Sequence, residues 1–449
     1  MSDSTGSKGS LFEGVTKYHW MVLIIASCGW LFDCMDQRIF ILARESALKE
    51  LLIGHEENID AVVKQYIGWA TMWMILGWAT GGIIFGMISD KFGRVKTMAM
   101  TLMVYSGFTG LSAVSTSYID FTIYRFLVGL GVGGMFGAAA ALVAESVPPR
   151  VRSLALGSLQ TLSALGNITG SLISLKLAPG LPAHLMGWEL DGWRALFLIG
   201  ILPSLLIIPI IFILREPEPW KQAKAAAQRG EAKKQLGTIP DLFRDERWRH
   251  NTLVGLALGV AGMIGLWGIG FYSPELVRSA LANETQEVKD FVASFGTALQ
   301  DVGAFCGMFV FTIIATYIGR RLAFLTSFIL SLFVVSFVFF FLKSASDAYW
   351  MLPILGFATL MPFGGYSIYF PELYPTRLRG VGIGFCYNVG RYITAPAPYL
   401  IGYLTTFLMD QGIDQPFRMA AVMMTSIYLV GMIALIWAPE TKGQPLPEE

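Results

Sequence analysis

A short stretch near the N-terminus carries charge where its surroundings are apolar. Leu31–Arg38 reads Leu-Phe-Asp-Cys-Met-Asp-Gln-Arg and places Asp33, Asp36 and Arg38 in an otherwise almost wholly apolar segment. If that segment crosses a bilayer, each charge costs at least ~2.5–3.5 kcal/mol at the helix centre. Asp33 and Asp36 are three residues apart, so they lie on one face of a helix. We expect them to face a water-filled polar pathway where carboxylates can take up protons. The alternative is that these charges lie at a helix end and contact water.

The elements that position these residues are apolar segments of membrane-spanning length. The 449 residues are 54% hydrophobic and only 14% charged, whereas a soluble domain carries about a quarter of charged residues. Apolar runs of ~20 residues recur, each able to cross ~30 Å of hydrocarbon. We expect twelve spans, at approximately 18–43, 63–88, 97–117, 119–144, 154–177, 194–214, 251–276, 291–315, 321–343, 348–370, 380–406 and 417–437. The chain is therefore predicted to be an all-α polytopic protein of the lipid bilayer, and its near-zero net charge argues against nucleic-acid binding.

A polar stretch divides the spans into two sets of six. We expect an N-terminal tail at 1–17, a first half at 18–214, a linker at 215–249, a second half at 250–438 and a C-terminal tail at 439–449. Lys and Arg are concentrated in the loops on the same side as the N-terminus. The positive-inside rule then places both termini in the cytoplasm, and we expect the protein in the plasma (inner) membrane.

The two halves repeat each other at their predicted cytoplasmic ends. The fourth span ends in Ala144–Arg152 and the tenth in Pro371–Arg379, and each segment contains a Glu, a Pro and an Arg-x-Arg pair. The loop Gly86–Lys96 has a shorter counterpart at Tyr317–Arg321, where Thr316 replaces Asp90. Parallel six-helix repeats with a substrate site between them at the midplane are a known transporter architecture.

These motifs resemble the major facilitator superfamily. Gly86–Lys96 is similar to the family's loop G-x-x-x-D-[RK]-x-G-R-[RK]-[RK], and the fourth span has an Arg followed by spaced glycines, from Arg125 to Gly133. Trp193–Pro203, Pro371–Arg379 and the Asp-x-x-Asp of the first span resemble the sialate and aromatic-acid proton symporters; Pro439–Gly443 is shared with sugar porters. The resemblance covers nearly the whole chain. It implies twelve transmembrane helices in two pseudo-symmetric six-helix halves, with alternating access to a small-molecule substrate.

The resemblance also implies a cytoplasmic gate. A charged clasp would form when the inner gate closes and break when it opens. The predicted gating residues are Gly86, Asp90, Gly93, Arg94, Glu145, Arg152, Glu372 and Arg379. The alternative, a loop that only follows the positive-inside rule, accounts for the Lys and Arg but not for Asp90 or the glycines.

Buried charges in the spans suggest a coupling scheme. Arg125 and Asp36 lie at similar depths from the outer side, so Asp36 or Asp33 can pair with Arg125. If a substrate carboxylate binds Arg125, the released Asp takes a proton and both cross together; the alternative is a static salt bridge. In the second half, Asp301 and Arg391 fall near the midplane. They form a buried charge pair, or Arg391 provides a second anion site.

Polar and aromatic residues at predicted cavity-facing positions are further substrate-binding candidates, although each aromatic side chain could instead lie at a membrane interface. They are Gln37, Gln160, Asn167, Trp267, Tyr272, Tyr366, Tyr369, Tyr387 and Asn388.

The favoured function is proton-coupled symport of an organic acid anion, sialate-like or aromatic, by a monomer. Alternatives are a sugar or organic-cation carrier or facilitator and a membrane sensor that does not transport. The sequence has no phosphate-binding loop of the Gly-x-x-x-x-Gly-Lys-Ser/Thr type and no His-Glu-x-x-His motif, which argues against an ATP-driven pump or a metalloprotease. The four cysteines show no paired spacing. We expect no enzyme activity, cofactor or metal.

Overall fold

The computed structural model describes residues 12–52, 59–177, 182–185, 188–229, 236–394 and 397–448, and helices make up most of them. The first half contains α1 (Lys17–Leu51), α2 (Ile59–Phe92), α3 (Arg94–Ser112), α4 (Tyr118–Ser146), α5 (Pro149–Thr161), α6 (Ser163–Leu177), α7 (Gly192–Ile199), the 3-10 helix η1 (Leu202–Leu206) and α8 (Ile207–Ile213). An antiparallel hairpin that the sequence did not predict, β1 (Pro182–Leu185) and β2 (Trp188–Asp191), connects α6 to α7 and pairs Pro182 with Asp191.

The linker contributes α9 (Glu218–Gln228) and α10 (Ile239–Arg244). The second half contains α11 (Glu246–Met263), the π-helical η2 (Ile264–Ile269), η3 (Gly270–Tyr272), α12 (Ser273–Ala280), α13 (Gln286–Tyr317), α14 (Arg320–Phe341), α15 (Ala345–Glu372), α16 (Arg379–Thr394), α17 (Ala397–Asp410), α18 (Pro416–Met424) and α19 (Ile427–Ala434).

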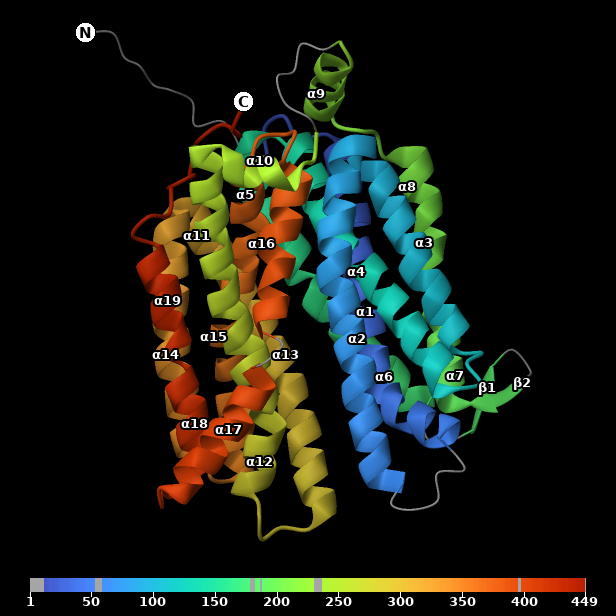
Figure 1. Cartoon of the computed structure of the whole chain (residues 1–449), viewed down its shortest axis with the longest axis vertical. Coiled ribbons are helices and arrows are strands. Elements are labelled where there is room, and N and C mark those ends of the chain that lie inside the picture. Colours follow the sequence, from blue (N-terminus) through green and yellow to red (C-terminus); the bar gives the residue numbers. More distant parts are fainter. Residues whose placement is uncertain are drawn as a thin grey trace.

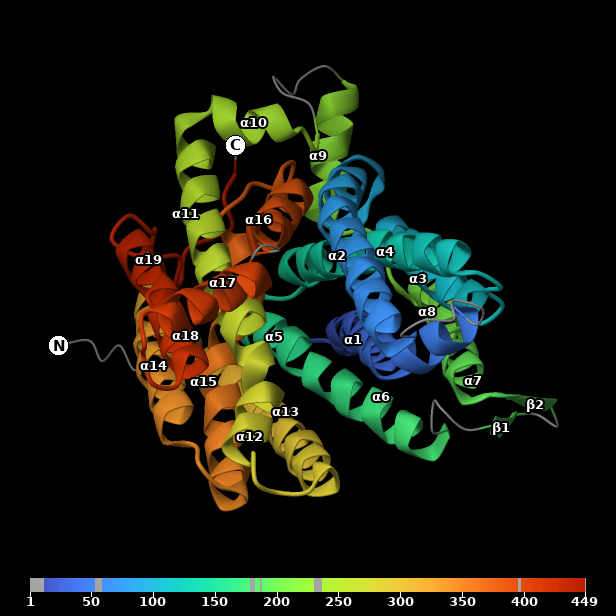
Figure 2. The same ribbon diagram turned by 60° about the horizontal axis from the view of Figure 1, so that its bottom comes forward.

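The helices form two bundles that lie side by side. In Figure 1 most blue-to-green helices of the first half are on the right and the yellow-to-red helices of the second half on the left, with α5 of the first half among the latter. Both α9 and α10 lie at the end of the molecule where α1 begins and the C-terminal tail ends (Figure 1). Figure 2, turned by 60°, keeps the two groups apart. The halves meet where α2 packs on α16 and α5 packs on α13.

Nine helical segments of the described chain are long and apolar enough to cross a membrane. The other three predicted spans correspond to α3, to α5 followed by α6, and to α16 followed by α17. The first of these carries Arg94 and Lys96 in its opening turn, and the second is divided into two shorter helices at Leu162. The twelve predicted spans therefore have helical counterparts, several of them interrupted.

The distribution of side chains is that of a membrane protein. Large apolar residues are exposed on the outside of the bundles, such as Phe212 at 83% and Phe333 at 67%, whereas Asp33, Asp36 and Arg125 are each 0% exposed. Soluble proteins rarely show so large an apolar surface. Charges inside the bundle are costly in a bilayer and so point to function.

A backbone carbonyl that a proline leaves without its helical hydrogen bond is bonded by a side chain of a neighbouring helix. Three prolines lie within α15, and Pro362 removes the N–H that would bond the carbonyl of Ala358. The Ser331 hydroxyl of α14 donates to that carbonyl at 2.7 Å. Neighbouring helices supply such bonds because no water does so in the hydrocarbon.

Candidate substrate and coupling site

Asp36 and Arg125 form an ion pair within the first half. Arg125 Nη1 lies 3.9 Å from Asp36 Oδ2, and both side chains are fully buried. The Thr109 hydroxyl donates to Asp36 Oδ1 at 2.7 Å, and Arg125 donates to the Ser112 hydroxyl at 2.6 Å. The pairing expected from equal depth is present, and the roles of both residues stay predictions.

The guanidinium of Arg125 is enclosed by aromatic rings of the same half. It lies over Phe197 at 4.7 Å, and over Phe40 and Phe121 at 5.6 and 5.9 Å. Such contacts help to hold a desolvated cation. Because these partners of Arg125 all belong to the first half, its position suits structural support of α1 better than direct contact with a substrate between the halves.

Asp33 has a different environment. It is fully buried, and among the described residues neither of its carboxylate oxygens has a hydrogen-bond partner. The charged groups that act on it are Asp36 and, from the second half, Arg391. A buried ionised carboxylate without hydrogen bonds is strongly disfavoured, so in this arrangement Asp33 is the acid with most to gain from a proton.

Arg391 comes from the second half and contacts both halves. It donates to the Tyr387 carbonyl at 2.8 Å and to Asn388 Oδ1 at 2.6 Å, both one turn earlier on α16. Its guanidinium lies 3.8 Å above the ring of Trp78 on α2. Among the described residues its Nε has no hydrogen-bond partner. Arg391 therefore has one donor free for an anion.

Aromatic rings from both halves surround this donor. Tyr387 stacks on Phe136 of α4 with ring centroids 4.2 Å apart, and Trp30 of α1 lies 6.4 Å from Tyr387. Trp267 meets Trp78 edge-on at 6.3 Å. Nearby polar atoms without a hydrogen-bond partner in the described chain include Gln160 Oε1, which lies beside Tyr387, and Gln37 Nε2, one turn from Asp33. Aromatic rings and polar atoms of both halves therefore lie close together around Arg391.

The predicted charge pair of Asp301 and Arg391 is wrong. Asp301 pairs instead with Arg38, 2.5 Å away across the two halves. The prediction compared only how deep Asp301 and Arg391 lie in the membrane. Which charges meet also depends on the direction in which each side chain leaves its helix.

Three of the tyrosines predicted to face the cavity have other surroundings. Tyr366 donates to the carbonyl of Leu258 within the second half, and Tyr369 donates to the carbonyl of Pro439 in the C-terminal tail, each at 2.7 Å. Their buried hydroxyls need such partners, so neither is free to bind substrate. Tyr272 packs by Phe417, 6.1 Å away, also within the second half. Asn167 is half-buried on α6.

Several gating candidates meet at the end of the molecule where α1 begins. Arg94 makes a bidentate contact with Glu145 at 2.9 and 3.1 Å and bonds Asp90 at 2.8 Å. Glu145 also pairs with Arg379 of the second half at 2.5 Å. Asp90 accepts from the backbone N–H groups of Gly380 and Val381, both at 2.9 Å. These contacts join the halves.

The second half repeats this arrangement. Arg320 contacts Glu372 at 2.7 and 3.0 Å, as Arg94 contacts Glu145, and it also bonds the Ser153 hydroxyl of α5. Arg152 lies within electrostatic range of Glu372 and Arg320. Thr316, the counterpart of Asp90, bonds only within its own helix, to the carbonyl of Thr312. Among the described residues, the contact that Asp90 makes with backbone N–H groups of the other half therefore has no counterpart at Thr316.

Glutamates at the ends of the two halves cap the helices that follow the gate loops. Glu216 accepts from the N–H groups of Arg94, Val95 and Lys96, and Glu440 accepts from those of Arg320 and Arg321 at 2.9 and 3.1 Å. The helices start at Gly93 and Gly319, whose φ values of 120° and 138° favour glycine. Partial burial raises the pKa of Glu440, but these N–H donors outweigh it and hold the pKa below its usual value.

Gly86 lies where α2 of the first half approaches α16 of the second. A Cβ added at Gly86 would come within 2.7 Å of the Gly380 carbonyl, so this glycine permits the close approach of α2 and α16.

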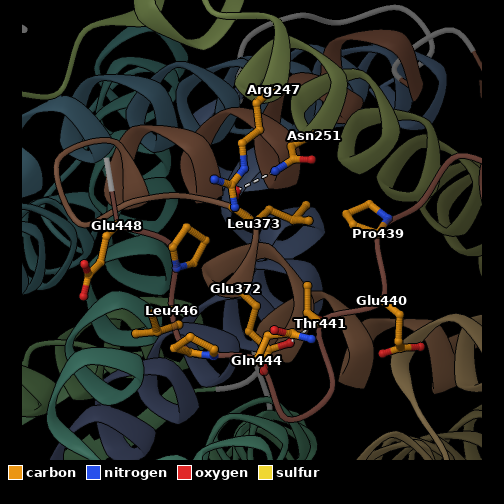
Figure 3. A pocket seen from close by; sticks show the side chains of 12 residues that line it. Arg247, Asn251, Glu372, Leu373, Pro439, Glu440, Thr441, Gln444, Leu446 and Glu448 are labelled. Atoms are coloured by element: carbon orange, nitrogen blue, oxygen red, sulfur yellow. Dashed lines mark hydrogen bonds between the residues drawn. The ribbon is translucent and has the colours of Figure 1, made fainter.

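A separate cavity of about 610 Å³ lies in the second half, beside the C-terminal tail. Figure 3 shows Arg247 and Asn251 on one side of it and the C-terminal tail from Pro439 to Glu448 around it. Thr441 of the tail donates to Glu372 at 2.6 Å. The cavity therefore adjoins Glu372, and none of the central charges lines it.

Four functional candidates were missed: Arg38, Glu216, Arg320 and Glu440. The repeat of Gly93-Arg94 as Gly319-Arg320 could have identified Arg320, and the Glu after each sixth span could have identified the two caps. The sequence places the charge of Arg38 within a predicted span, but it does not indicate that Asp301 is its partner.

Comparisons with known proteins agree with this geometry. Residues 29–398 match the family described as Major Facilitator Superfamily. The cis,cis-muconate transport protein of Acinetobacter baylyi is 28% identical, over 88% of this chain and 89% of its own. The sialic acid transporter NanX of Escherichia coli (strain K12) is 30% identical, over 86% and 87%.

A solved structure has the same fold. The proton:xylose symporter XylE, bound to 6-bromo-6-deoxy-D-glucose, superposes with a TM-score of 0.75 at 17% identity, over 96% of this chain and 98% of its own. The acid transporters among the relatives agree with the branch that the sequence motifs indicate. With its all-α two-bundle architecture and a family match over most of its length, this chain belongs to the Major Facilitator Superfamily.

Proposed function

We propose that this transporter carries an organic acid anion together with protons. The observation that carries the proposal is the position of Asp33 and Arg391. They come from different halves, act on each other electrostatically at the centre of the molecule, and each has polar atoms without a hydrogen-bond partner in the described chain.

The proposed cycle follows from charge balance. Without substrate, Arg391 provides the positive charge that permits the otherwise disfavoured ionised form of Asp33. When a substrate carboxylate binds the free Nε of Arg391, a second carboxylate nearby becomes unfavourable, and Asp33 takes a proton. Anion and proton then neutralise the site together. Asp36 is held by Arg125 and Thr109, and we propose that it fixes the orientation of α1 and tunes the affinity of Asp33 for its proton.

The lining favours an acid with a flat or unsaturated body. Tyr387, Phe136, Trp30 and Trp78 provide ring surfaces on both sides of the interface, and aromatic stacking adds to area burial. Relatives named for muconate and sialic acid transport support organic acids as the class. We propose Gln37, Gln160, Asn388 and Trp267 as contacts that shape specificity.

The cross-half contacts at the cytoplasmic end support assignment of this conformation as closed to the cytoplasm. We propose that Asp90, Arg94, Glu145 and Arg379 separate when the inner side opens, with Gly86, Gly93, Arg152 and Glu372 supporting the clasp. We further propose that the protein is a monomer in the plasma membrane, with both termini and the 215–249 linker in the cytoplasm.

The test is uptake by purified protein in proteoliposomes with an imposed inward proton gradient. The panel contains benzoate, cis,cis-muconate, sialic acid and xylose, with protein-free liposomes to subtract diffusion of the weak acids. We expect gradient-driven accumulation of an acid that Asp33→Asn abolishes, while exchange of that acid survives. Arg391→Gln should lose both accumulation and exchange. Accumulation of xylose alone, or acid equilibration that ignores the gradient, would contradict the proposal.

A further inference from the structure

The Arg38–Asp301 contact is an ion pair between the halves away from the cytoplasmic gate. Arg38 Nη2 on α1 lies 2.5 Å from Asp301 Oδ2 on α13, and the two side chains are 23% and 21% exposed. The ion pairs of the gate, by contrast, are almost fully buried: Arg94–Glu145, Arg379–Glu145 and Arg320–Glu372. The pair is therefore accessible to a small solute while it bridges the interface.

The local packing directs Arg38 across that interface. α1 packs against α6 at Gly166 and Gly170, and a Cβ on Gly170 would come within 3.0 Å of Arg38 Cβ. Small residues four apart allow helices in a membrane to approach closely. The stem of Arg38 can thus lie along α6, and its guanidinium reaches the second half.

Alternating access gives this contact a consequence. The halves move against each other around a fixed site, so a pair with one member in each half is disturbed during the cycle. A guanidinium released inside the membrane needs another anion, because an unpaired buried charge is strongly unfavourable. Arg38 and Asp301 are exposed to a similar degree, 23% and 21%, so water can partly compensate either charge, and an anion that replaces Asp301 beside Arg38 compensates the guanidinium more fully.

Arg38 and Arg391 both lie within electrostatic range of one short segment of α1. Both act electrostatically on the Cys34 thiol, and Arg38 is one helical turn from Cys34, about 6 Å along the axis. A ligand that contacts both arginines needs an acidic group at each end.

We propose that Arg38 is a specificity-determining residue for a second carboxylate, and that Asp301 occupies the place of that carboxylate when no substrate is bound. The preferred substrate class is then a dicarboxylate. This inference rests on the proposed transport of acid anions. One carboxylate binds Arg391, and the other displaces Asp301 from Arg38, which frees the halves to move.

A purely structural pair makes a different prediction. It would need both members for stability, and loss of either would impair all substrates alike. A substrate-displaced pair has opposite effects at its two ends. Loss of Arg38 removes the cation that attracts one end of a dicarboxylate. Loss of the Asp301 charge removes the group that competes with that end for Arg38.

The experiment measures KM for cis,cis-muconate and for benzoate in proteoliposomes of the full chain, corrected with protein-free liposomes. A charge-assisted contact of ordinary strength predicts that Arg38→Gln raises the KM for muconate about tenfold or more, and that for benzoate less than about twofold. Asp301→Asn should lower the KM for muconate. Arg38→Lys should recover part of the loss. Arg44→Gln, on the same helix but bonded to Thr71, should leave the ratio of the two KM values unchanged.

The outcomes separate the two proposals. Wild-type transport of benzoate without preference for muconate, or equal effects of Arg38→Gln on both acids, would overturn the dicarboxylate inference and leave acid transport intact. Transport of neither of these acids, nor of sialic acid, would overturn both. A lowered KM in Asp301→Asn cannot arise from misfolding, so failure to see it, in a variant that still transports benzoate, also counts against the inference.

Discussion

Glu145 on α4 and Arg379 on α16 form a fully buried ion pair across the two halves, with 2.5 Å between Oε1 and Nη1. The same carboxylate receives two hydrogen bonds from Arg94. One glutamate of the first half therefore holds two arginines at the cytoplasmic end, and it is the charge whose loss should open that end most readily.

Glu145→Gln is expected to weaken the closed state. Removing one member of a buried ion pair costs about 3–5 kcal/mol because the remaining charge is left without compensation, and here Arg94 and Arg379 both lose their shared partner. The closed population should fall accordingly, and the inner face should become accessible without substrate.

Accessibility can be measured at Thr312, which is buried and lies against Gly157 across the interface. In a background with Cys28, Cys34, Cys306 and Cys386 replaced, Thr312→Cys should react faster with a permeant maleimide when Glu145→Gln is present. Glu13→Gln is the control, because Glu13 pairs with Arg150 in an exposed position where ion pairs contribute little. Equal labelling rates in the two variants would exclude Glu145 as a gate residue.

Gly384→Ala should disrupt the interface between the halves. A Cβ at Gly384 would lie 2.2 Å from the carbonyl oxygen of Gly82 on α2, and overpacking typically costs about 1–3 kcal/mol. Gly402→Ala is the matched control, since a Cβ there meets nothing within 4 Å and alanine gains up to ~1 kcal/mol in a helix. We expect the apparent melting temperature in detergent to fall for the first variant and to hold or rise for the second. A rise for both would show that α2 and α16 are less tightly packed.

The contact between Glu440 of the C-terminal tail and the start of α14 should depend on pH. Its pKa is lower in the folded protein than in the unfolded chain, so the cap stabilises the fold above the unfolded pKa and the contribution is lost as pH falls through the folded pKa. Protease cleavage of the tail should therefore increase at acidic pH.

Glu440→Gln should make that cleavage fast at neutral pH and remove most of its pH dependence. Glu448→Gln, with a carboxylate that caps neither α3 nor α14 in the described chain, should behave as wild type. If Glu440→Gln kept the wild-type pH profile, another group would have to control the tail.

Much of the architecture follows from the sequence because helix geometry is regular. A fixed rise per residue placed Asp36 and Arg125 at equal depth, and the ion pair is present. The repeated Glu and Arg at the ends of the fourth and tenth spans likewise predicted where Glu145, Arg379 and Glu372 gather.

Rotation around the helices and the placement of the halves could not be derived in this way. Arg38 reaches Asp301 because Gly170 leaves room for its stem, and Arg391 lies over Trp78 of the other half. Both contacts depend on how separate helices pack. Tyr369 was misplaced for a related reason, since its partner is the carbonyl of Pro439 in the tail, remote in sequence.

The most direct test of the account is whether protons enter with the acid. Proteoliposomes containing an internal pH dye, with no imposed gradient, receive external cis,cis-muconate or sialic acid, and the internal pH is followed. Wild type should acidify the interior in proportion to acid uptake, and Asp33→Asn should exchange acid without acidification. Acid uptake by the wild type with an unchanged internal pH would contradict proton coupling and reduce Asp33 to a structural or substrate-binding role.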